Sequence, residues 1–314
     1  MNENEFIDKQ DQIDREVSLT ELFNVLWIGK KLILAFTSLF MVIAIIYSLV
    51  LPNIYQSKAL LSPVNTSGGL GTAFDSLSGL ATFSGINLQS KESTNITLKA
   101  LEKLNSLSFF SENILPNIYL PNLMAVRSWD SKNNTIHYDK NIFDESSKKW
   151  VRDFSFPHTQ IPSAQESYEE FLDEHLEISE DKKSGFISIA INHQSPHIAK
   201  AWVELIVQEL NNFFISKDKT QAQAAIDYLN KQIAQTGFAE VKEVIAQLLQ
   251  NRIRDLSLIE VSDFYILEYI DPPAVMEEKS EPSRILILIF GTILGSVLGA
   301  TVVLFRHYFN KKIK

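Results

Sequence analysis

Two long apolar runs without charged residues dominate the hydrophobic pattern of this chain. They cover Leu32–Leu51 and Ile285–Phe305. A helix rises about 1.5 Å per residue, so about 20 residues span roughly 30 Å of hydrocarbon, and a helix satisfies its own backbone hydrogen bonds in lipid. The pattern therefore predicts two transmembrane helices, 32–51 and 285–305, on either side of one large domain, 52–284.

Basic residues flank the two runs unevenly. The outer flanks carry Lys30, Lys31, Arg306, Lys311, Lys312 and Lys314, whereas the inner flanks carry Lys58, Lys279 and Arg284. The positive-inside rule predicts that the tails 1–31 and 306–314 are cytoplasmic and that 52–284 lies across the membrane. A cleaved signal peptide is the alternative for the first run, but this run lies deep in the chain, behind an acidic stretch, and is too long.

The domain between the runs has a mixed pattern. Alternating residues predict strands at 55–61, Phe186–Asn192 and Phe264–Ile270. The glycine-rich segment Thr66–Leu88 is too apolar for a flexible linker, and we expect a loop and a small helix packed on a sheet. Residues 116–167 are polar with scattered prolines, which predicts irregular surface structure.

A long helical pattern follows the best strand. Ser195 and Pro196 have the form of an N-cap and a first-turn proline. Apolar residues then recur at helical spacing to Gly237, which predicts a turn and a returning helix. The predicted fold is an α+β membrane protein, with an α/β base (52–194 and 260–284) and a long helical hairpin (195–259). Two antiparallel helices cannot bury all of their apolar faces, so part of this surface is available to other copies.

Composition excludes several classes of function. The chain has no cysteine, which excludes disulfides, cysteine-type zinc sites and a thiol nucleophile. Acidic residues exceed basic ones, 38 against 29. The basic residues form no stripe with aromatics, so we do not expect nucleic acid as a partner.

The candidates for catalysis or metal binding are weak. His193 and His197 have the spacing of a metal pair on a helix, but the predicted helix starts between them. An acidic cluster contains Glu169, Glu170, Asp173, Glu174 and Glu177. A solvated helix face explains this cluster better than a glycan-hydrolysing acid/base pair does. With no phosphate-binding GxxxxGK[ST] loop either, we expect no catalytic residue, no cofactor and no metal site.

The candidate interaction residues lie at the second apolar run. Gly291, Gly295 and Gly299 share one helix face, where a neighbouring helix can approach closely, either the first span or another subunit. Pro272, Pro273 and Pro282 fix backbone φ in the segment that enters the run, which is a linker or a stiff support for the base. Arg284 is placed to reach lipid phosphate.

The whole chain resembles the Wzz chain-length determinant family, the polysaccharide co-polymerases of bacterial inner membranes. The resemblance rests on YQSKALLSP (55–63), GINLQSKES (85–93), HQSPHIAKAWVELIVQELN (193–211) and DPPAVMEEKSEPSR (271–284), followed by the three glycines. The proline-rich segment joined to a glycine-repeat span is its most specific part. The predicted helical hairpin is short compared with the longest members of the family.

The resemblance implies a non-enzymatic regulator of the chain length of a surface polysaccharide, foremost the O-antigen of lipopolysaccharide. It implies a homo-oligomeric ring in the inner membrane, with the domain in the periplasm, acting with the O-antigen polymerase on lipid-linked glycan. The alternative within the family is a co-polymerase for capsule or exopolysaccharide, working with a separate tyrosine kinase chain. A periplasmic sensor, for which we expect a cytoplasmic output domain, and a periplasmic glycan enzyme remain less favoured.

Overall fold

The chain divides into two compact units. The computed structural model describes residues 19–64, 98–261 and 264–311. A span unit contains residues 1–52 and 281–314, and an inter-span unit contains residues 53–280. The predicted loop and small helix of the glycine-rich segment Thr66–Leu88 lie outside the described residues.

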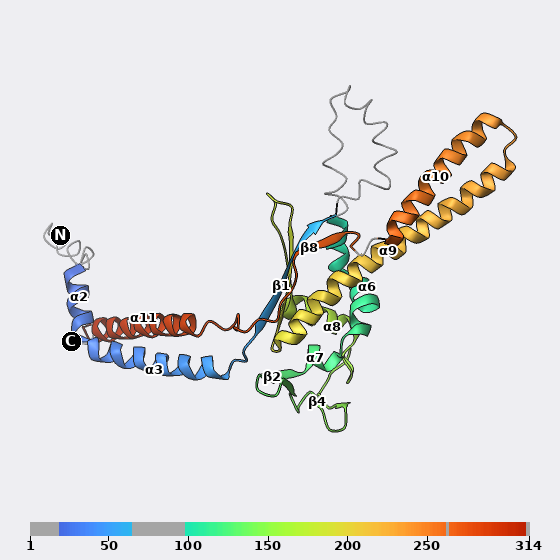
Figure 1. Ribbon diagram of the computed structural model, residues 1–314. Coiled ribbons are helices and arrows are strands. Elements are labelled where there is room, and N and C mark those ends of the chain that lie inside the picture. The colour runs from blue at the N-terminus through green and yellow to red at the C-terminus, as the bar shows by residue number, and fades with distance from the viewer. Residues whose placement is uncertain (1–18, 65–97, 262–263, 312–314) are drawn as a thin grey trace, which may run out of the picture. The chain divides into compact units, whose positions relative to one another are not determined.

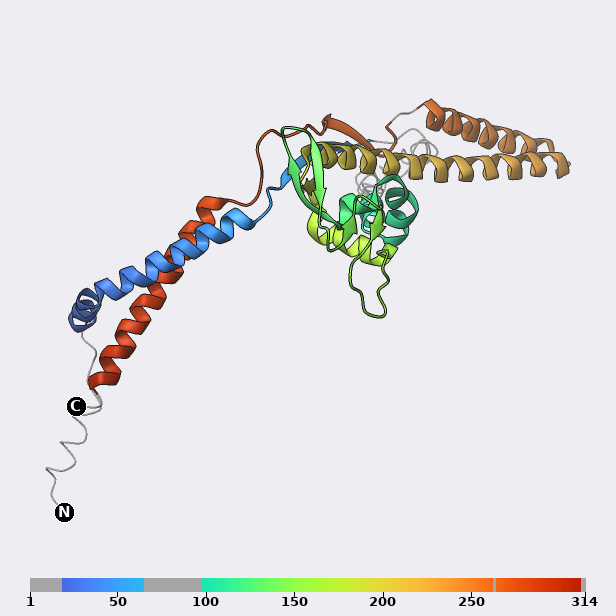
Figure 2. The same ribbon diagram turned by 90° about the horizontal axis from the view of Figure 1, so that it is seen from below.

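Three helices form the described part of the span unit. They are α2 (Leu19–Ile28), α3 (Lys30–Val50) and α11 (Arg284–Lys311). By length and composition, α3 and α11 are able to cross a membrane, and they contain the two predicted apolar runs. The two helices run side by side in both views (Figure 1, Figure 2). Gly29, between α2 and α3, lies directly against Val303 of α11.

A four-stranded antiparallel sheet organises the inter-span unit. Its order is β6 (Leu176–Glu180), β7 (Ile187–His193), β1 (Tyr55–Pro63) and β8 (Leu267–Asp271). Ala59 of β1 lies opposite Ile189 of β7, and Leu61 lies opposite Ile187. Directly paired residues share a face of the sheet, and all four of these side chains are fully buried. The predicted alternation of the two strands thus corresponds to one side of the core.

Helix α9 (Pro196–Gln235) covers this apolar face of the sheet. Its other side meets short helical segments through two aromatic contacts, Trp202 with Phe171 and Phe213 with Phe109. These segments are residues 98–104, α6 (Leu107–Phe109), η2 (Phe110–Ile114), α8 (Ala164–Glu170) and η4 (Phe171–His175). The core therefore surrounds the first half of α9. Ser195 occupies the predicted N-cap position, but its side chain makes no capping hydrogen bond.

A helical hairpin continues beyond the core. Residues 236–238 connect α9 to α10 (Ala239–Val261), which returns beside α9 in both views (Figure 1, Figure 2). After Phe214, the buried residues of α9 are Ala222 and Ile226. The exposed apolar residues of the returning half are Phe238, Val241, Val244, Leu248, Ile253, Leu258 and Val261. Within the described residues, the hairpin helices bury only the side that each turns to the other, and their remaining faces are not covered.

The prediction of irregular structure over residues 116–167 holds for residues 151–163, which form no helix or strand, but was wrong for residues 116–150. The segment contains η3 (Leu115–Asn117), α7 (Leu120–Met124), a hairpin of β2 (Val126–Asp130) with β3 (Thr135–Tyr138), and a hairpin of β4 (Phe143–Asp144) with β5 (Lys149–Trp150). Phe143 packs edge-on against Tyr138 and Trp150 and joins the two hairpins. Strands of two to five residues are too short to show a period of two in the sequence.

Candidate functional site

The structure separates the two histidines that have metal-pair spacing. His193 ends β7 and is buried, whereas His197 is exposed in the first turn of α9. The Nδ1 atom of His193 accepts a hydrogen bond from the Ser195 N–H at 2.8 Å. Nε2 therefore carries the ring proton, and this N–H donates a hydrogen bond to the Asn122 carbonyl oxygen at 2.9 Å. Among the described residues, no group of three or more His, Cys, Asp and Glu side chains is placed to hold a metal ion.

A second buried histidine packs against His193. The ring of His175 stacks on it with centroids 5.6 Å apart, and Trp202 lies edge-on to both rings. The His175 Nδ1–H donates to the Asn192 carbonyl oxygen at 2.6 Å. Burial lowers the pKa of His175 and lowers that of His193 to about 4. Both rings are therefore neutral at pH 7 and act as packed, hydrogen-bonded core groups.

The acidic cluster does not form one helix face. Helix α8 ends at Glu170, a turn of π-helix follows, and Glu177 already belongs to β6, where it accepts hydrogen bonds from Gln56 and Asn192. Glu170 and Glu174 line a small cavity of about 110 Å³ beside the two buried histidines. Burial raises the pKa of Glu170, and the neighbouring carboxylates raise it further. The cluster is solvated as predicted at Glu169, Asp173, Glu174 and Glu177, which are exposed, but it is not one helix face, because α8 changes to η4 within it and Glu177 lies on a strand.

The buried amide of Asn211 joins α9 to the start of β8. Its Oδ1 accepts from the backbone N–H groups of Tyr265, Ile266 and Leu267 at 2.9, 2.8 and 3.3 Å. Its Nδ2 donates to the carbonyl oxygens of Val207 and Leu267. Because these N–H groups turn toward the asparagine, β8 begins at Leu267, later than the predicted Phe264. The sequence signal was a polar residue in the apolar stripe of α9.

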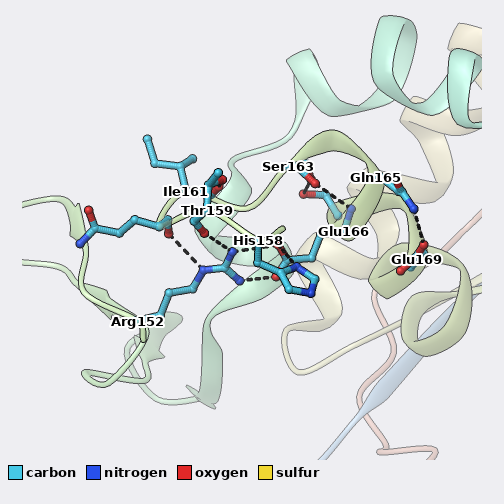
Figure 3. Close-up of polar contacts among 10 residues, drawn as sticks. Arg152, His158, Thr159, Ile161, Ser163, Gln165, Glu166 and Glu169 are labelled. Atoms are coloured by element: carbon cyan, nitrogen blue, oxygen red, sulfur yellow. Dashed lines mark hydrogen bonds and ion pairs between the residues drawn. The ribbon is translucent and has the colours of Figure 1, made fainter. Parts of the chain in front are cut away.

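Arg152 fixes the segment between β5 and α8 (Figure 3). Its guanidinium pairs with both carboxylate oxygens of Glu166 and donates to the backbone carbonyl oxygens of Thr159 and Gln160. The arginine holds the pKa of the Glu166 carboxyl below its usual value. Sequence reasoning missed this site, because nothing in the spacing of Arg152 and Glu166 indicates a contact.

The three glycines of α11 lie against α3 of the same chain. A Cβ atom at Gly291 would lie 2.6 Å from the Ala44 Cβ, and one at Gly295 would lie 2.9 Å from the Thr37 Cα. At Gly299 it would lie 2.9 Å from the Ile33 Cα. Real Cβ contacts are longer, so the close approach depends on glycine. The sequence left two neighbours open for this glycine face, the first span or another subunit. The structure shows the first span, α3, in contact with it.

The proline-rich segment is attached to β1 within the inter-span unit. The Ser57 hydroxyl donates to the Ala274 carbonyl oxygen at 2.8 Å, and the Ser280 N–H donates to the Ile54 carbonyl oxygen at 2.9 Å. Pro273 is buried, whereas Pro272 is exposed. Residues 272–280 therefore run along the edge of the sheet and are held near both ends. Pro282 and Arg284 belong to the span unit, at the start of α11.

Comparison with known proteins gives a family match and a set of similar solved structures, among them two of polysaccharide co-polymerases. Residues 15–112 match the Wzz family of chain length determinant proteins. A full-length bacterial polysaccharide co-polymerase is 14% identical, with 94% of this chain and 99% of that chain covered and a TM-score of 0.41. A fragment of WzzB, a polysaccharide co-polymerase from Salmonella Typhimurium, is 13% identical, with 73% and 100% covered and a TM-score of 0.31. The comparison with curated proteins found no match.

The family match confirms the resemblance predicted from the sequence. The matched residues include α3 and β1, which contain the first apolar run and the YQSKALLSP segment. The chain thus combines a segment that matches the chain length determinant family, residues 15–112, with two apolar helices and a mixed helix and strand unit between them in the sequence.

Proposed function

We propose that the protein is a non-enzymatic polysaccharide co-polymerase that sets the chain length of a surface polysaccharide. The match of residues 15–112 to the chain length determinant family carries this proposal. Two apolar helices of sufficient length support a regulator that is anchored in a membrane. The polysaccharide that we assign is the O-antigen of lipopolysaccharide.

The proposed location is the bacterial inner membrane, with both termini in the cytoplasm and residues 52–284 in the periplasm. The unequal basic flanks of the two helices support this orientation. The proposed partners are the membrane-embedded O-antigen polymerase, its lipid-linked glycan and other copies of this chain in a homo-oligomeric ring. The exposed apolar residues of the α9–α10 hairpin support contact between copies.

The decisive experiment compares the glycan ladder of the host with and without this chain. Deletion should replace a preferred length by a broad, mostly shorter distribution, and the cloned chain should restore the preferred length. An unchanged ladder would disprove the O-antigen assignment, and a simultaneous change in capsule or exopolysaccharide size would transfer the function to that polymer. Glu170→Gln and Asp173→Asn should each leave the restored ladder unchanged, because we assign neither carboxylate to catalysis.

The glycine face of α11 provides a test in the membrane. In Gly295→Leu the new side chain meets the backbone of α3 around Thr37, so the two spans must separate. We expect the inter-span unit to fold and the preferred glycan length to be lost. Val302→Leu on the same helix is the matched control. A wild-type ladder from Gly295→Leu, at a normal protein level, would remove the glycines from the proposed site.

The orientation is tested separately with reporters that are active only outside the cytoplasm. A fusion after Ser216 should be active, and fusions at Asn4 and Lys314 should be inactive. An active reporter at Lys314 would contradict the proposed topology and with it the two-span arrangement.

A further inference from the structure

An open groove of about 550 Å³ lies where α9 leaves the sheet. It is lined by Asn113 of η2 and by six residues of α9, which are Asn212, Phe213, Ser216, Lys217, Thr220 and Gln221. The lining combines three side-chain amides, two hydroxyls, one ammonium group and one aromatic ring. It contains no carboxylate.

The amides of this groove differ from the neighbouring buried amide. Asn211 uses both ends of its amide in hydrogen bonds to Val207 and to residues 265–267. Asn212, one position further along α9, is exposed. Within the described residues, the side-chain amides of Asn113, Asn212 and Gln221 make no hydrogen bond. Each presents a donor and an acceptor to the groove.

An aromatic ring forms a fixed surface in the groove. Phe213 packs edge-on against Phe109 and Phe214, with centroids 5.9 and 5.4 Å apart, so its orientation is set by the core. Its side chain is still partly exposed. One face of the Phe213 ring carries the Lys103 ammonium, whose Nζ lies over the ring 4.6 Å from its centroid, so a ligand has only the rest of the ring to pack on. The Lys217 Nζ lies over the neighbouring Phe214 ring, 5.8 Å from its centroid.

This set of groups matches the chemistry of a sugar chain. An amide can donate to one hydroxyl and accept from the adjacent hydroxyl of the same ring, and the apolar C–H face of a sugar packs on an aromatic surface. The lysines favour an acidic glycan over a basic one, because they supply positive charge and none of the residues that line the groove carries a carboxylate. A small number of placed polar groups around an apolar surface is the usual composition of a ligand site.

We propose that this groove binds a segment of the polysaccharide, with Asn212 and Gln221 contacting hydroxyl pairs and Phe213 supporting a sugar ring. Lys217 pairs with an acidic substituent where the glycan carries one. The proposal rests on the proposed function and assigns the residues that touch the glycan. The competing occupants are residues 65–97 of the same chain and a second copy of the chain.

Photo-crosslinking identifies the occupant directly. The chain has no cysteine, so Ser216→Cys introduces a single thiol in the groove that can carry a benzophenone. The full chain should be labelled and irradiated in membranes that contain lipid-linked polysaccharide. We expect a ladder of adducts that stains for carbohydrate, whereas a label at Gln247→Cys on α10 should give none. An adduct within one chain, a dimer of two chains or no adduct would each overturn the proposal.

A double substitution measures the contribution of the amides. Asn212→Ala with Gln221→Ala should weaken binding of the delipidated host polysaccharide to the purified full chain by at least about tenfold, because each amide loses both of its hydrogen bonds to a hydroxyl pair. Asn251→Ala with Gln247→Ala on α10 is the matched control and should bind like the wild type. Equal binding by both double variants would disprove the proposal that the polysaccharide binds in this groove.

The two proposals fail in different ways. If the wild-type chain sets the ladder but the groove variants bind glycan normally, the groove is wrong and the function stands. If the ladder does not respond to the wild-type chain, the proposed function is wrong, whatever the purified protein binds.

Discussion

The two parts of α9 have the same backbone but different surroundings. In the proximal part, residues 196–214, the helix lies between the sheet and the short helices, and Val203 and Leu210 are fully buried. In the distal part, residues 215–235, the main described neighbour is α10, Tyr265 contacts only the first turn through Asp218, and Tyr228 is 62% exposed. The proximal part is stabilised by the core of its own chain, whereas the distal part has faces that no described residue of the chain covers.

This difference explains how one helix can both stabilise the core of its own chain and present a surface for contact with partners. A core position is costly to change, because surrounding groups cannot collapse around a lost side chain. A position on the distal hairpin is tolerant within a single chain, so its apolar residues are free to contact partners. We expect the boundary between the proximal and the distal part to lie near Phe214, the last buried residue of α9 before Ala222.

The largest effect is expected for Leu210→Ala in the proximal part. Leu210 is fully buried, so the substitution should lower the free energy of unfolding by about 3 kcal/mol. Ile226→Ala in the distal part should cost about 1 kcal/mol, because the hairpin can relax around the smaller side chain. Denaturant unfolding of the full chain in detergent, followed by tryptophan fluorescence, measures both. Equal losses would show that the core extends into the hairpin.

The stacked rings of His175 and His193, which pack on Trp202 of α9, should make the free energy of unfolding fall at acidic pH. The folded pKa of His193, about 4, is below the usual 6.5, so the unfolded chain binds more protons between these values. His193 should therefore contribute full stability above pH 6.5 and lose roughly 3 kcal/mol as the pH falls to 4. The lowered pKa of His175 acts in the same direction, and the raised pKa of Glu170 opposes both.

Melting temperatures between pH 7 and pH 4 measure this effect. His193→Gln should flatten the profile, and His197→Gln, at an exposed position, should leave it unchanged. A flat wild-type profile would mean that protonation of the buried rings does not oppose folding.

A smaller effect is expected at the boundary itself. Asn211→Ala removes the acceptor of three backbone N–H groups, including that of Ile266, and should destabilise the chain by about 2 kcal/mol. Hydrogen exchange at Tyr265 and Ile266 should increase more than exchange in β7. Asn230→Ala, at an exposed site in the distal part, is the control. An equal increase in hydrogen exchange across the whole sheet would show that Asn211 does not stabilise the start of β8 specifically.

The smallest stability change is expected on the distal hairpin. Val244→Ser changes a side chain that is 56% exposed, so the free energy of unfolding should move by less than about 0.5 kcal/mol. If copies meet along α10, chemical cross-linking of the full chain in membranes should nevertheless decrease. Glu243→Ser is a polar control at the adjacent position. Unchanged cross-linking by Val244→Ser would exclude this part of α10 from the contact.

Sequence patterns predicted the elements that have a long and regular environment. The two apolar helices are continuous apolar runs of sufficient length to cross a membrane. Strands β1 and β7 and helix α9 have buried side chains that recur at strand or helix spacing, and this repetition is visible in the chain. The short hairpins between Val126 and Trp150 have too few residues to repeat, so they were missed.

The polar contacts were also beyond sequence reasoning. The partners of Asn211, His175 and Arg152 are distant in the chain or have no fixed spacing, and only the folded backbone brings them together. The glycine face was recognisable because its spacing is helical, but the identity of the helix that it meets depends on the structure.

Asn211 also has a mechanical consequence. Helix α9 continues without interruption from this asparagine to Gln235, which is roughly 36 Å of rigid rod at the usual rise per residue. A tilt of about 5° at that pivot would displace the tip by about 3 Å over such a length. The same amide holds the first residues of β8, and β8 leads through the proline-rich segment to the second span. Any such tilt would act through the Asn211 amide on residues 265–267, at the start of the strand that precedes that span.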